Sequence, residues 1–393
     1  MEQNTLKRRG TGLIGIDAEL AWPGYTLYAP LAGRVRPGGG SEASPRRARG
    51  PAPSTQPGRG VVDLVDLKGE LVHRWNLPHR PGRHARLLPG GVLAYNGATL
   101  EISPLFPMWR KYSGGSMGAY DRNGTLLNEV RDDYQHHDAH HYDDGRVLYT
   151  AVEPLTGAAA ARVEGGVPGT EADGIVWADV IREVAADGTP RWEWKAFEHL
   201  EPADFGLQPH YWREHWPLIN SVYPLDEHTV VASLRSVSAV IRIDRRTGAY
   251  TILADRNTVA QQHHATAIGD GKLLIFDNGT FRTGESVTFS RVIEIDATTG
   301  EVGWIYQDSP REAFFTPFMG GAQRLPNGNT LVTEAAFGRI FEVTADRRIC
   351  WEYVVPSFTD YPDPDTAAIF PGLSNAIFRA YRYGAADIPW LES

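Results

Sequence analysis

The sequence has little cysteine, no long apolar run and no excess of positive charge. A single cysteine, Cys350, excludes an internal disulfide framework and a cysteine-rich zinc site. No apolar stretch approaches the ~20 residues of a membrane span, and residues 1–20 lack the ~7–15-residue apolar core of a secretory signal. The net charge of −9 argues against a nucleic-acid or acidic-membrane surface. We therefore expect a soluble, cytoplasmic protein with neither nucleic acid nor membrane as a partner.

Glycine and tryptophan are frequent, with 41 and 11 copies, and a hairpin pattern recurs along the chain. Each copy is an alternating apolar run, a turn with Gly or a charged pair, and a second apolar run. Such alternation predicts strands, and Asp-Gly, Asn-Gly or Thr-Gly between the runs predicts a hairpin. The six copies are 61–75, 117–130, 180–194, 239–253, 291–306 and 339–353.

A second kind of hairpin, with a Pro/Asp/Gly turn, lies between copies of the first. Its five copies are 84–97, 137–151, 220–235, 263–278 and 321–335. Two hairpins per repeat give a four-stranded blade, so we predict an all-β fold: one six-bladed β-propeller of antiparallel four-stranded blades spanning residues 1–393. We expect the Pro/Gly/Ser/Arg-rich segment 36–60 to be a mobile insertion, because it has almost no apolar residues to bury.

Counting in register within the second hairpin gives candidate site residues, because equivalent positions of successive blades form a ring around the axis. Five residues before the Leu325 position lie Arg83, His137, Asn220, His263 and Gly320, and His264 follows at the next position. Ten residues after the Leu325 position lie Arg235 and Asn278. We predict that His137, Asn220, Arg235 and His263 line one opening of the central channel.

Several of these segments resemble a known family. "GGAQRLPNGNTLVTEAAFGRIFEVTADRRICWEY" (320–353), "QQHHATAIGDGKLLIFDNGTFR" (261–282) and "NSVYPLDEHTVVASLRSVSAVIRID" (220–244) are similar to the bacterial PAPS-independent arylsulfotransferases, which are six-bladed propellers. The resemblance runs from about Gly12 to Tyr383, apart from the 36–60 segment. It implies ping-pong transfer of a sulfuryl group between phenolic compounds through a channel histidine.

The resemblance also implies roles for single residues. The nucleophile of the family lies in a "QH" motif, which corresponds to His263 after Gln262, and a supporting histidine corresponds to His137. An arginine corresponds to Arg235 and an asparagine to Asn220. A neutral imidazole is a competent nucleophile, and the other groups stabilise negative charge on the sulfuryl oxygens. We expect these residues and Asn278, His264 and His140 to bind a small aromatic or phenolic substrate, with no cofactor required for sulfuryl transfer.

One position departs from the family pattern. The family has a further histidine two residues before the asparagine, where this chain has Leu218, and His215 lies three residues further back. The substitution removes one potential cation from the sulfuryl site.

Two other functions fit the sequence. "QHHDAHH" (135–141) contains four of the thirteen histidines, and His137, His140 and His263 could hold a divalent transition metal in a lyase, isomerase or hydrolase acting on an aromatic or natural-product substrate. The propeller could instead be a non-catalytic binding platform. Metal content separates the first alternative from sulfuryl transfer, and an ordered small anion in the channel disfavours the second. The oligomeric state does not follow from the sequence.

Overall fold

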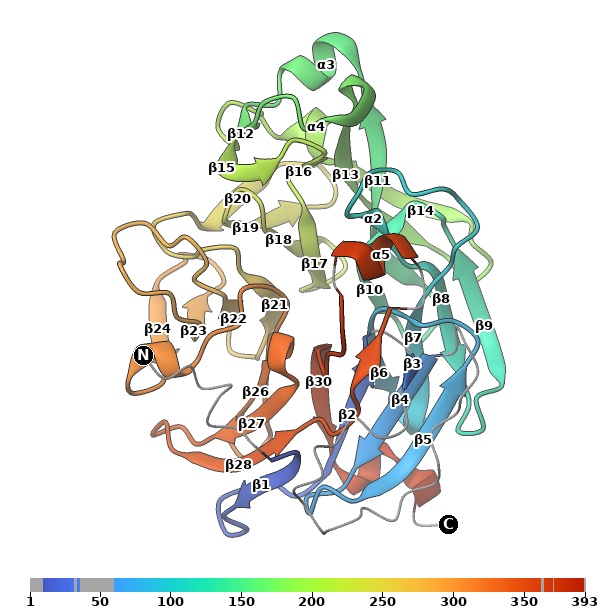
Figure 1. Cartoon of the computed structure of the whole chain (residues 1–393), viewed down its shortest axis with the longest axis vertical. Coiled ribbons are helices and arrows are strands. Elements are labelled where there is room, and N and C mark those ends of the chain that lie inside the picture. Colours follow the sequence, from blue (N-terminus) through green and yellow to red (C-terminus); the bar gives the residue numbers. More distant parts are fainter. Residues whose placement is uncertain (1–9, 32–33, 36–59, 362–363, 370, 392–393) are drawn as a thin grey trace.

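The computed structural model describes residues 10–31, 34–35, 60–361, 364–369 and 371–391, and it is a β-propeller of six antiparallel sheets around one axis (Figure 1). The predicted fold class is confirmed. The two repeated hairpins are the inner and the outer strand pairs of the blades. The predicted mobile insertion at 36–60 lies, except for Gly60, outside the described residues.

The blades are numbered in chain order and written from the inner to the outer strand. Blade 1 is β30 (Ile377–Tyr383), β2 (Tyr25–Pro30), β4 (Gly60–Val65) and β5 (Leu71–Leu77). Blade 2 is β6 (Pro81–Leu88), β7 (Val92–Ala98), β8 (Gly115–Tyr120) and β9 (Leu126–Arg131). Blade 3 is β10 (Gln135–His141), β11 (Val147–Leu155), β13 (Val176–Val184) and β14 (Pro190–Lys195).

The other three blades follow the same order. Blade 4 is β17 (Ile219–Pro224), β18 (Thr229–Leu234), β19 (Ala239–Asp244) and β20 (Tyr250–Ala254). Blade 5 is β21 (His263–Ala267), β22 (Lys272–Asp277), β23 (Arg291–Asp296) and β24 (Val302–Tyr306). Blade 6 is β25 (Gly321–Arg324), β26 (Thr330–Glu334), β27 (Arg339–Val343) and β28 (Ile349–Val354), with β1 (Gly12–Ile16) added outside β28.

Short elements complete the chain. Strands β3 (Arg34–Val35) and β29 (Thr359–Asp360) pair, as do β12 (Gly165–Val167) and β15 (Leu207–Trp212), and β16 (His215–Trp216) joins β13. The α-helices are α2 (Trp109–Tyr112), α3 (Gly157–Ala161), α4 (Ala196–His199) and α5 (Pro364–Ile369). The 3-10 turns are Pro89–Gly91, Ala172–Gly174, Arg311–Ala313, Ala335–Phe337, Ala385–Asp387 and Pro389–Leu391.

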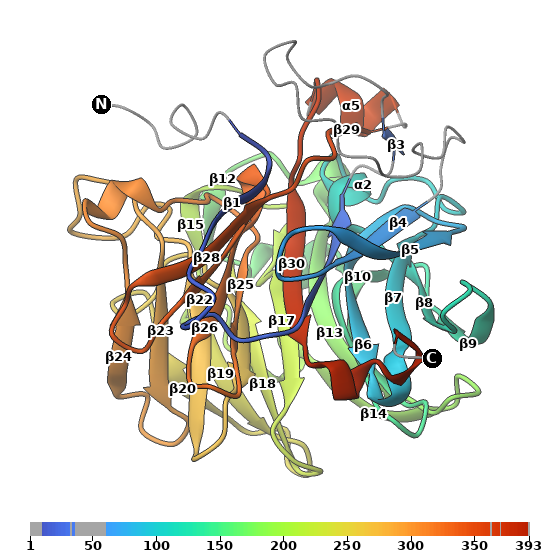
Figure 2. The same ribbon diagram turned by 90° about the horizontal axis from the view of Figure 1, so that it is seen from below.

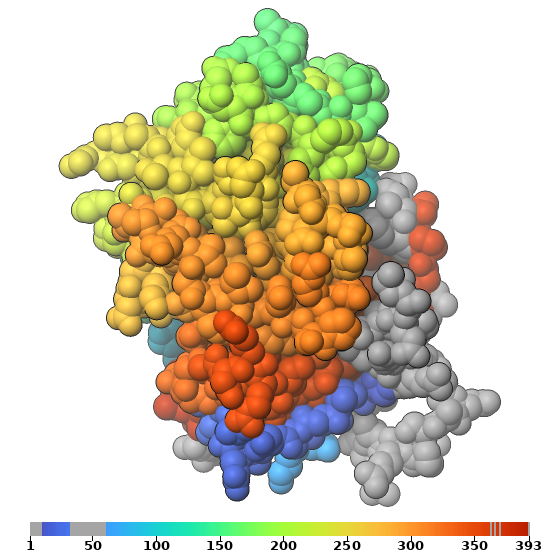
Figure 3. Space-filling view, turned by 90° about the vertical axis from the view of Figure 1, so that its left-hand side faces the viewer, coloured from blue at the N-terminus to red at the C-terminus, as the bar shows by residue number. Residues whose placement is uncertain are grey.

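The two ends of the described chain meet in blade 1 and close the ring. Its inner strand β30 comes from the C-terminal end and pairs with β2 from the N-terminal end, with Tyr25 opposite Tyr383. Successive blades lie side by side, as the colour bands in Figure 3 show. The ring predicted from the repeats is therefore closed by pairing between distant parts of the sequence.

Tryptophans on outer strands hold neighbouring blades together. The indole Nε1 of Trp75 in blade 1 donates to the Asp121 carbonyl in blade 2 at 3.0 Å. Trp194 donates to the Gly248 carbonyl of the next blade at 3.0 Å, and Trp351 in blade 6 donates to the Leu67 carbonyl of blade 1 at 2.8 Å. Trp75, Trp194 and Trp351 are fully buried. Each therefore fills the space between two blades while its N–H is satisfied by a turn of the neighbour.

The two ends of the channel differ in what covers them. Figure 2 shows α2, α5, β3 and β29 gathered at one end of the ring.

No helix in the described part of the chain is long and apolar enough to cross a membrane.

Candidate active site in the channel

β-Bulges in the inner strands shape the centre of the ring. The pairing register shifts between Pro81 and Ala85 in β6, between His136 and Ala139 in β10, and between His263 and Thr266 in β21. Within these bulges His137 and His264 adopt left-handed backbone angles, with φ of 45° and 51°. A bulge interrupts the alternation of side chains and redirects them. Successive residues therefore line opposite ends of the channel.

A cavity of about 280 Å³ lies at the end of the channel beside α2. Its lining combines cations, two histidines and apolar side chains. These residues are Arg83, Met108, Lys111, Tyr112, His137, Leu218, Arg235, His263, Phe318, Met319 and Phe378. None of these described residues is acidic. We call this space the cationic cavity.

Among the described residues, the hydrogen-bond partners of Arg83 and Arg235 are neutral groups. Arg235 Nη2 donates to Gln261 Oε1 at 3.1 Å, and its guanidinium lies 5.4 Å from the centre of the Tyr211 ring. Arg83 donates to the Lys111 carbonyl and lies near the Met319 sulfur. Burial lowers the pKa of Arg83 to about 10 and that of Lys111 to about 6. At neutral pH the Arg83 guanidinium therefore keeps its charge, whereas the Lys111 amine is mostly neutral.

His263 has a defined tautomer. Asn278 Nδ2 donates to the carbonyls of Thr316 and Met319 at 2.9 and 2.8 Å, so its Oδ1 faces His263. His263 Nδ1 lies 2.7 Å from that oxygen and must carry the proton. Its Nε2 is then a lone-pair nitrogen, which accepts a bond from the Met319 N–H at 3.2 Å. Burial and then Arg235 hold the pKa of His263 well below its usual value, so the ring is neutral.

His137 is joined to a buried polar chain. Its Nδ1 lies 2.9 Å from Nδ1 of His136, and His136 Nε2 lies 2.9 Å from Asp179 Oδ1. The same Asp179 oxygen lies 3.1 Å from His215 Nε2, and His215 Nδ1 lies 3.1 Å from the Tyr112 hydroxyl. Both branches therefore begin at Asp179 and end at residues of the cationic cavity. Burial, then His136, lowers the pKa of His137.

An aromatic cavity of about 320 Å³ adjoins the cationic cavity, with which it shares Met108, Tyr112, Leu218, Arg235 and Phe318. Its other aromatic walls are His210, Tyr211, Trp212, His215 and Phe281. Glu214 also lines it, is 5% exposed, and has an oxygen, Oε2, with no hydrogen-bond partner among the described residues. Desolvation raises the pKa of Glu214 to about 7.

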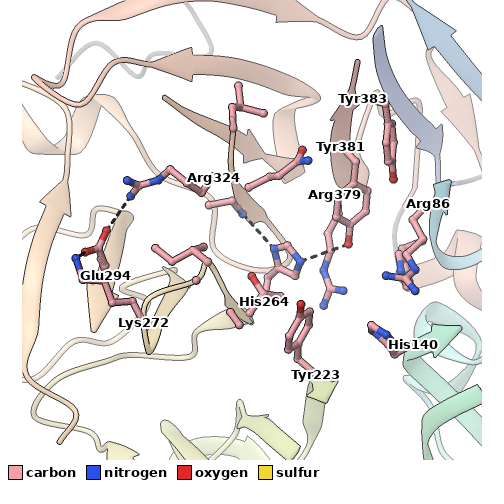
Figure 4. A pocket seen from close by; sticks show the side chains of 18 of the residues that line it. Arg86, His140, Tyr223, His264, Lys272, Glu294, Arg324, Arg379, Tyr381 and Tyr383 are labelled. Carbon is pink, nitrogen blue, oxygen red and sulfur yellow. Dashed lines mark hydrogen bonds and ion pairs between the residues drawn. The ribbon is translucent and has the colours of Figure 1, made fainter. Parts of the chain in front are cut away.

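The opposite end of the channel opens into a cavity of about 700 Å³ (Figure 4). We call it the polar cavity, since it is lined by Arg86, Asp138, His140, Tyr223, His264, Lys272, Glu294, Arg324, Arg379 and Tyr381 among others. Glu294 binds Arg324 at 2.9 Å and Lys272 at 2.7 Å, and Asp138 binds Arg379 at 2.9 Å. Figure 4 shows His264 beside Tyr381, whose hydroxyl lies 3.3 Å from Nε2. Most cations here have a carboxylate partner.

The predicted residues fall into three groups. His137, Arg235 and His263 line the cationic cavity as placed by the register. Asn278 orients His263, and buried Asn220 donates to the Gln262 carbonyl at 2.8 Å, so neither amide lines that cavity.

His140 and His264 do not join that group, because they line the polar cavity at the other end. They therefore do not face the cavity that His263 lines, contrary to the expectation that all of these residues lie around one substrate. The expected metal set of His137, His140 and His263 is not assembled, since the β10 bulge separates His137 from His140. The group that the described residues do bring within ligand distance is His136, Asp179 and His215.

Sequence reasoning missed several residues of the site. Arg83 occupies the same register position as His137, and this position could have identified it as a residue of the site. Lys111 and Tyr112 come from α2, between β7 and β8. Phe378 comes from β30, the inner strand of blade 1, which has no hairpin partner nearby in sequence. Glu214 precedes β16 and carries no motif.

Comparison with known proteins gives a family and a fold. Residues 112–355, more than half of the chain, match the family described as Arylsulfotransferase (ASST). No curated protein matches the chain. A protein of unknown function from Bacteroides caccae is similar in structure, with a TM-score of 0.50 and 10% identity over 91% of this chain and 98% of that one. Virginiamycin B lyase from Staphylococcus aureus gives a TM-score of 0.43 and 12% identity over 89% and 91%.

Proposed function

The chain belongs to the arylsulfotransferase family, and from this premise we propose that it transfers a sulfuryl group from an aryl sulfate to a second phenol through His263. The observation that supports this most is the composition of the cationic cavity. Arg83 is buried there, Arg235 is partly buried, and neither forms an ion pair with the described residues. A buried cation without a partner is costly, and a sulfate ester would supply the missing charge.

The neighbouring aromatic cavity supports the same substrate class. Tyr211, Phe281 and Phe318 give flat apolar walls directly beside Arg235. An aryl sulfate has an apolar ring joined to an anionic group. The aromatic cavity suits the ring, and the cationic cavity suits the sulfate. The histidine expected at position 218 is Leu, and in this proposal Arg83 provides positive charge in its place.

In the first half-reaction, the hydrogen bond from the Met319 N–H to Nε2 of neutral His263 breaks, and the freed Nε2 lone pair attacks sulfur. The N–S bond forms as the ester S–O bond breaks, which leaves an N-sulfohistidine and a phenolate. Asn278 Oδ1 accepts a hydrogen bond from Nδ1–H and stabilises the positive charge that develops on the ring. Arg83, Arg235 and His137 stabilise the sulfuryl oxygens. Protonated Glu214 gives its proton to the leaving phenolate.

In the second half-reaction, an acceptor phenol enters the aromatic cavity. The Glu214 carboxylate takes the phenolic proton as the oxygen attacks sulfur and the N–S bond breaks. His263 returns to its neutral form and Glu214 to its protonated form, so protons and charges balance over the cycle. A carboxyl group with a pKa near 7 is suited to act in both directions at neutral pH.

Trapping the intermediate tests the proposal. Incubation with excess 4-nitrophenyl sulfate and no acceptor should release one equivalent of 4-nitrophenol in a burst and add one sulfuryl mass to the peptide that contains His263. Addition of phenol should remove that mass. If neither burst nor adduct forms at long times, while 4-nitrophenyl sulfate binds in the cavity, the transfer chemistry is wrong and only the anion site remains.

A further inference from the structure

Three buried ligand-type side chains meet beside the cationic cavity. His136 comes from β10, Asp179 from β13 and His215 from β16, and they are 0%, 0% and 2% exposed. The parallel pairing of β16 with β13 at Trp177 and Ala178 brings His215 next to Asp179. Asp179 and His215, which are 36 positions apart in sequence, are thus held together by strand pairing.

The spacing of their ligand atoms matches a metal centre. Asp179 Oδ1 lies 2.9 Å from His136 Nε2 and 3.1 Å from His215 Nε2. The three ligand atoms all lie within 4.8 Å of one another. Ligands at ~2.0–2.2 Å from a metal ion lie about 3 Å apart at the right angles of an octahedral site and roughly 3.4 Å apart in a tetrahedral zinc site. The second oxygen, Oδ2, accepts the Ile219 N–H at 3.0 Å, which fixes the carboxylate plane.

His136 Nε2 lacks a hydrogen bond despite this proximity. No well-aligned hydrogen bond joins it to a described residue, although Asp179 Oδ1 lies 2.9 Å away. A fully buried ring nitrogen without a partner is costly, and a metal ion that accepts its lone pair would remove that cost.

The other ring nitrogens have the partners that metal-bound histidines require. His136 Nδ1 lies 2.9 Å from His137 Nδ1, and His215 Nδ1 lies 3.1 Å from the Tyr112 hydroxyl. Ligating histidines usually donate their second N–H in this way, which fixes the tautomer that presents Nε2 to the metal.

We propose that His136, Asp179 and His215 bind one divalent transition-metal ion through Nε2, a carboxylate oxygen and Nε2. Two histidines and one carboxylate suit Zn²⁺ or Fe²⁺. The ion would enter through the aromatic cavity, which His215 lines. A metal-bound His136 carries its proton on Nδ1 and donates to His137 Nδ1, so His137 carries its own proton on Nε2 as a donor. The site does not depend on sulfuryl transfer.

Metal content and Zn²⁺ binding of the full chain test this site. Wild-type protein should contain about one equivalent of transition metal by mass spectrometry. After removal by a chelator it should bind one Zn²⁺ by calorimetry, with a rise in Tm, and Co²⁺ should give d–d absorption bands. Asp179→Asn and His215→Gln should each weaken Zn²⁺ binding by more than the roughly 10–100-fold lost with an outer hydrogen-bond partner. His140→Gln, on the same strand β10 but facing the polar cavity, should bind as wild type.

The wild-type measurements keep the test decisive if the variants do not fold. Absence of metal in protein from metal-supplemented growth, with no Co²⁺ bands and no Zn²⁺ effect on Tm, would overturn the site. Equal Zn²⁺ affinity of wild type, Asp179→Asn and His215→Gln would also overturn it, because the ion would then bind elsewhere. In either case the cluster is a hydrogen-bonded support for His137.

Discussion

The two ends of the channel use neighbouring residues of the same strands and yet differ in charge balance. Arg83, His137, His263 and Phe378 line the cationic cavity, and the residues that follow each of them line the polar cavity. In the polar cavity Glu294 and Asp138 bind arginine or lysine side chains. In the cationic cavity no lining residue in the described chain is acidic.

This difference separates structural charge from functional charge. A cation paired with a fixed carboxylate mainly stabilises the fold, whereas a buried cation without one is ready to receive an anion. Size does not decide between the ends, since the polar cavity is the larger at about 700 Å³ against about 280 Å³. Matched substitutions at the two ends can therefore test whether the substrate binds in the cationic cavity.

Replacement of the central histidines should give the largest contrast. His263→Ala removes the proposed nucleophile, so the phenol burst, the sulfuryl adduct and turnover of 4-nitrophenyl sulfate should all be lost. His264→Ala changes the next residue, which faces the polar cavity, and should retain the burst and the adduct. Stopped-flow release of 4-nitrophenol and peptide mass spectrometry measure both variants. Loss of the adduct in His264→Ala but not in His263→Ala would mean that sulfuryl transfer takes place in the polar cavity.

Replacement of the acidic residues should give opposite effects at the two ends. Glu214→Gln removes the proposed acid–base group and should lower kcat by about 10²-fold or more. Glu294→Gln breaks contacts with Arg324 and Lys272 in the polar cavity and should leave kcat close to that of wild type. Steady-state assays with 4-nitrophenyl sulfate and phenol give both values. Unchanged kcat in Glu214→Gln would assign proton transfer to another group.

Stability against pH provides a control for Glu214. Burial raises its pKa to about 7 from an ordinary value of 4.5. Between these values the folded state binds more protons than the unfolded state, so the Glu214 contribution to stability falls as pH rises. Glu214→Gln should therefore have a higher free energy of unfolding than wild type at pH 8, and denaturant titration checks this. A loss of activity together with a gain in stability would not be produced by misfolding.

Much of the fold was predictable because each hairpin is local in sequence. The alternation and turn residues of 61–75 or 321–335 specify two adjacent strands without reference to the rest of the chain. The inner strand β30 was not found as a blade strand, because its partner β2 lies at the other end of the chain. Phe378 and Arg379 were missed for this reason.

The site was predictable only as far as the repeat register extends. His137 and His263, which share a register position, do line one cavity, but bulges are not visible in the sequence, so the place of His264 in the polar cavity did not follow from the register. Asp179 can be recognised as a candidate metal ligand only in the folded chain, where strand pairing brings two histidines to its carboxylate.

Neutralising arginines should give a smaller contrast than changing the reacting groups. Arg235→Met and Arg83→Met each remove a charge-assisted hydrogen bond of about 1.5–3 kcal/mol, which corresponds to about a 10–100-fold loss of kcat/KM. Arg324→Met, whose charge is paired with Glu294, should change kcat/KM by less than about twofold. Kinetics at fixed ionic strength compare the three variants. Equal losses in all three would mean that general electrostatics, not the cationic cavity, binds the substrate.

The smallest effect should come from restoring the family histidine. Leu218 lines both the cationic and the aromatic cavity and has a left-handed backbone, with φ of 59°, which histidine and asparagine tolerate better than leucine.

Leu218→His adds one hydrogen bond to a cavity that Arg83 and Arg235 already make positive. Burial should keep the new ring neutral, as it does for His263. A neutral hydrogen bond contributes about 0.5–1.5 kcal/mol, so kcat/KM for 4-nitrophenyl sulfate should rise by no more than roughly tenfold. Leu218→Asn is the matched control, because it relieves the same backbone strain without an imidazole. A rise of a hundredfold or more in Leu218→His alone would show that the cavity lacks an essential group, and that Arg83 does not take the place of the missing histidine.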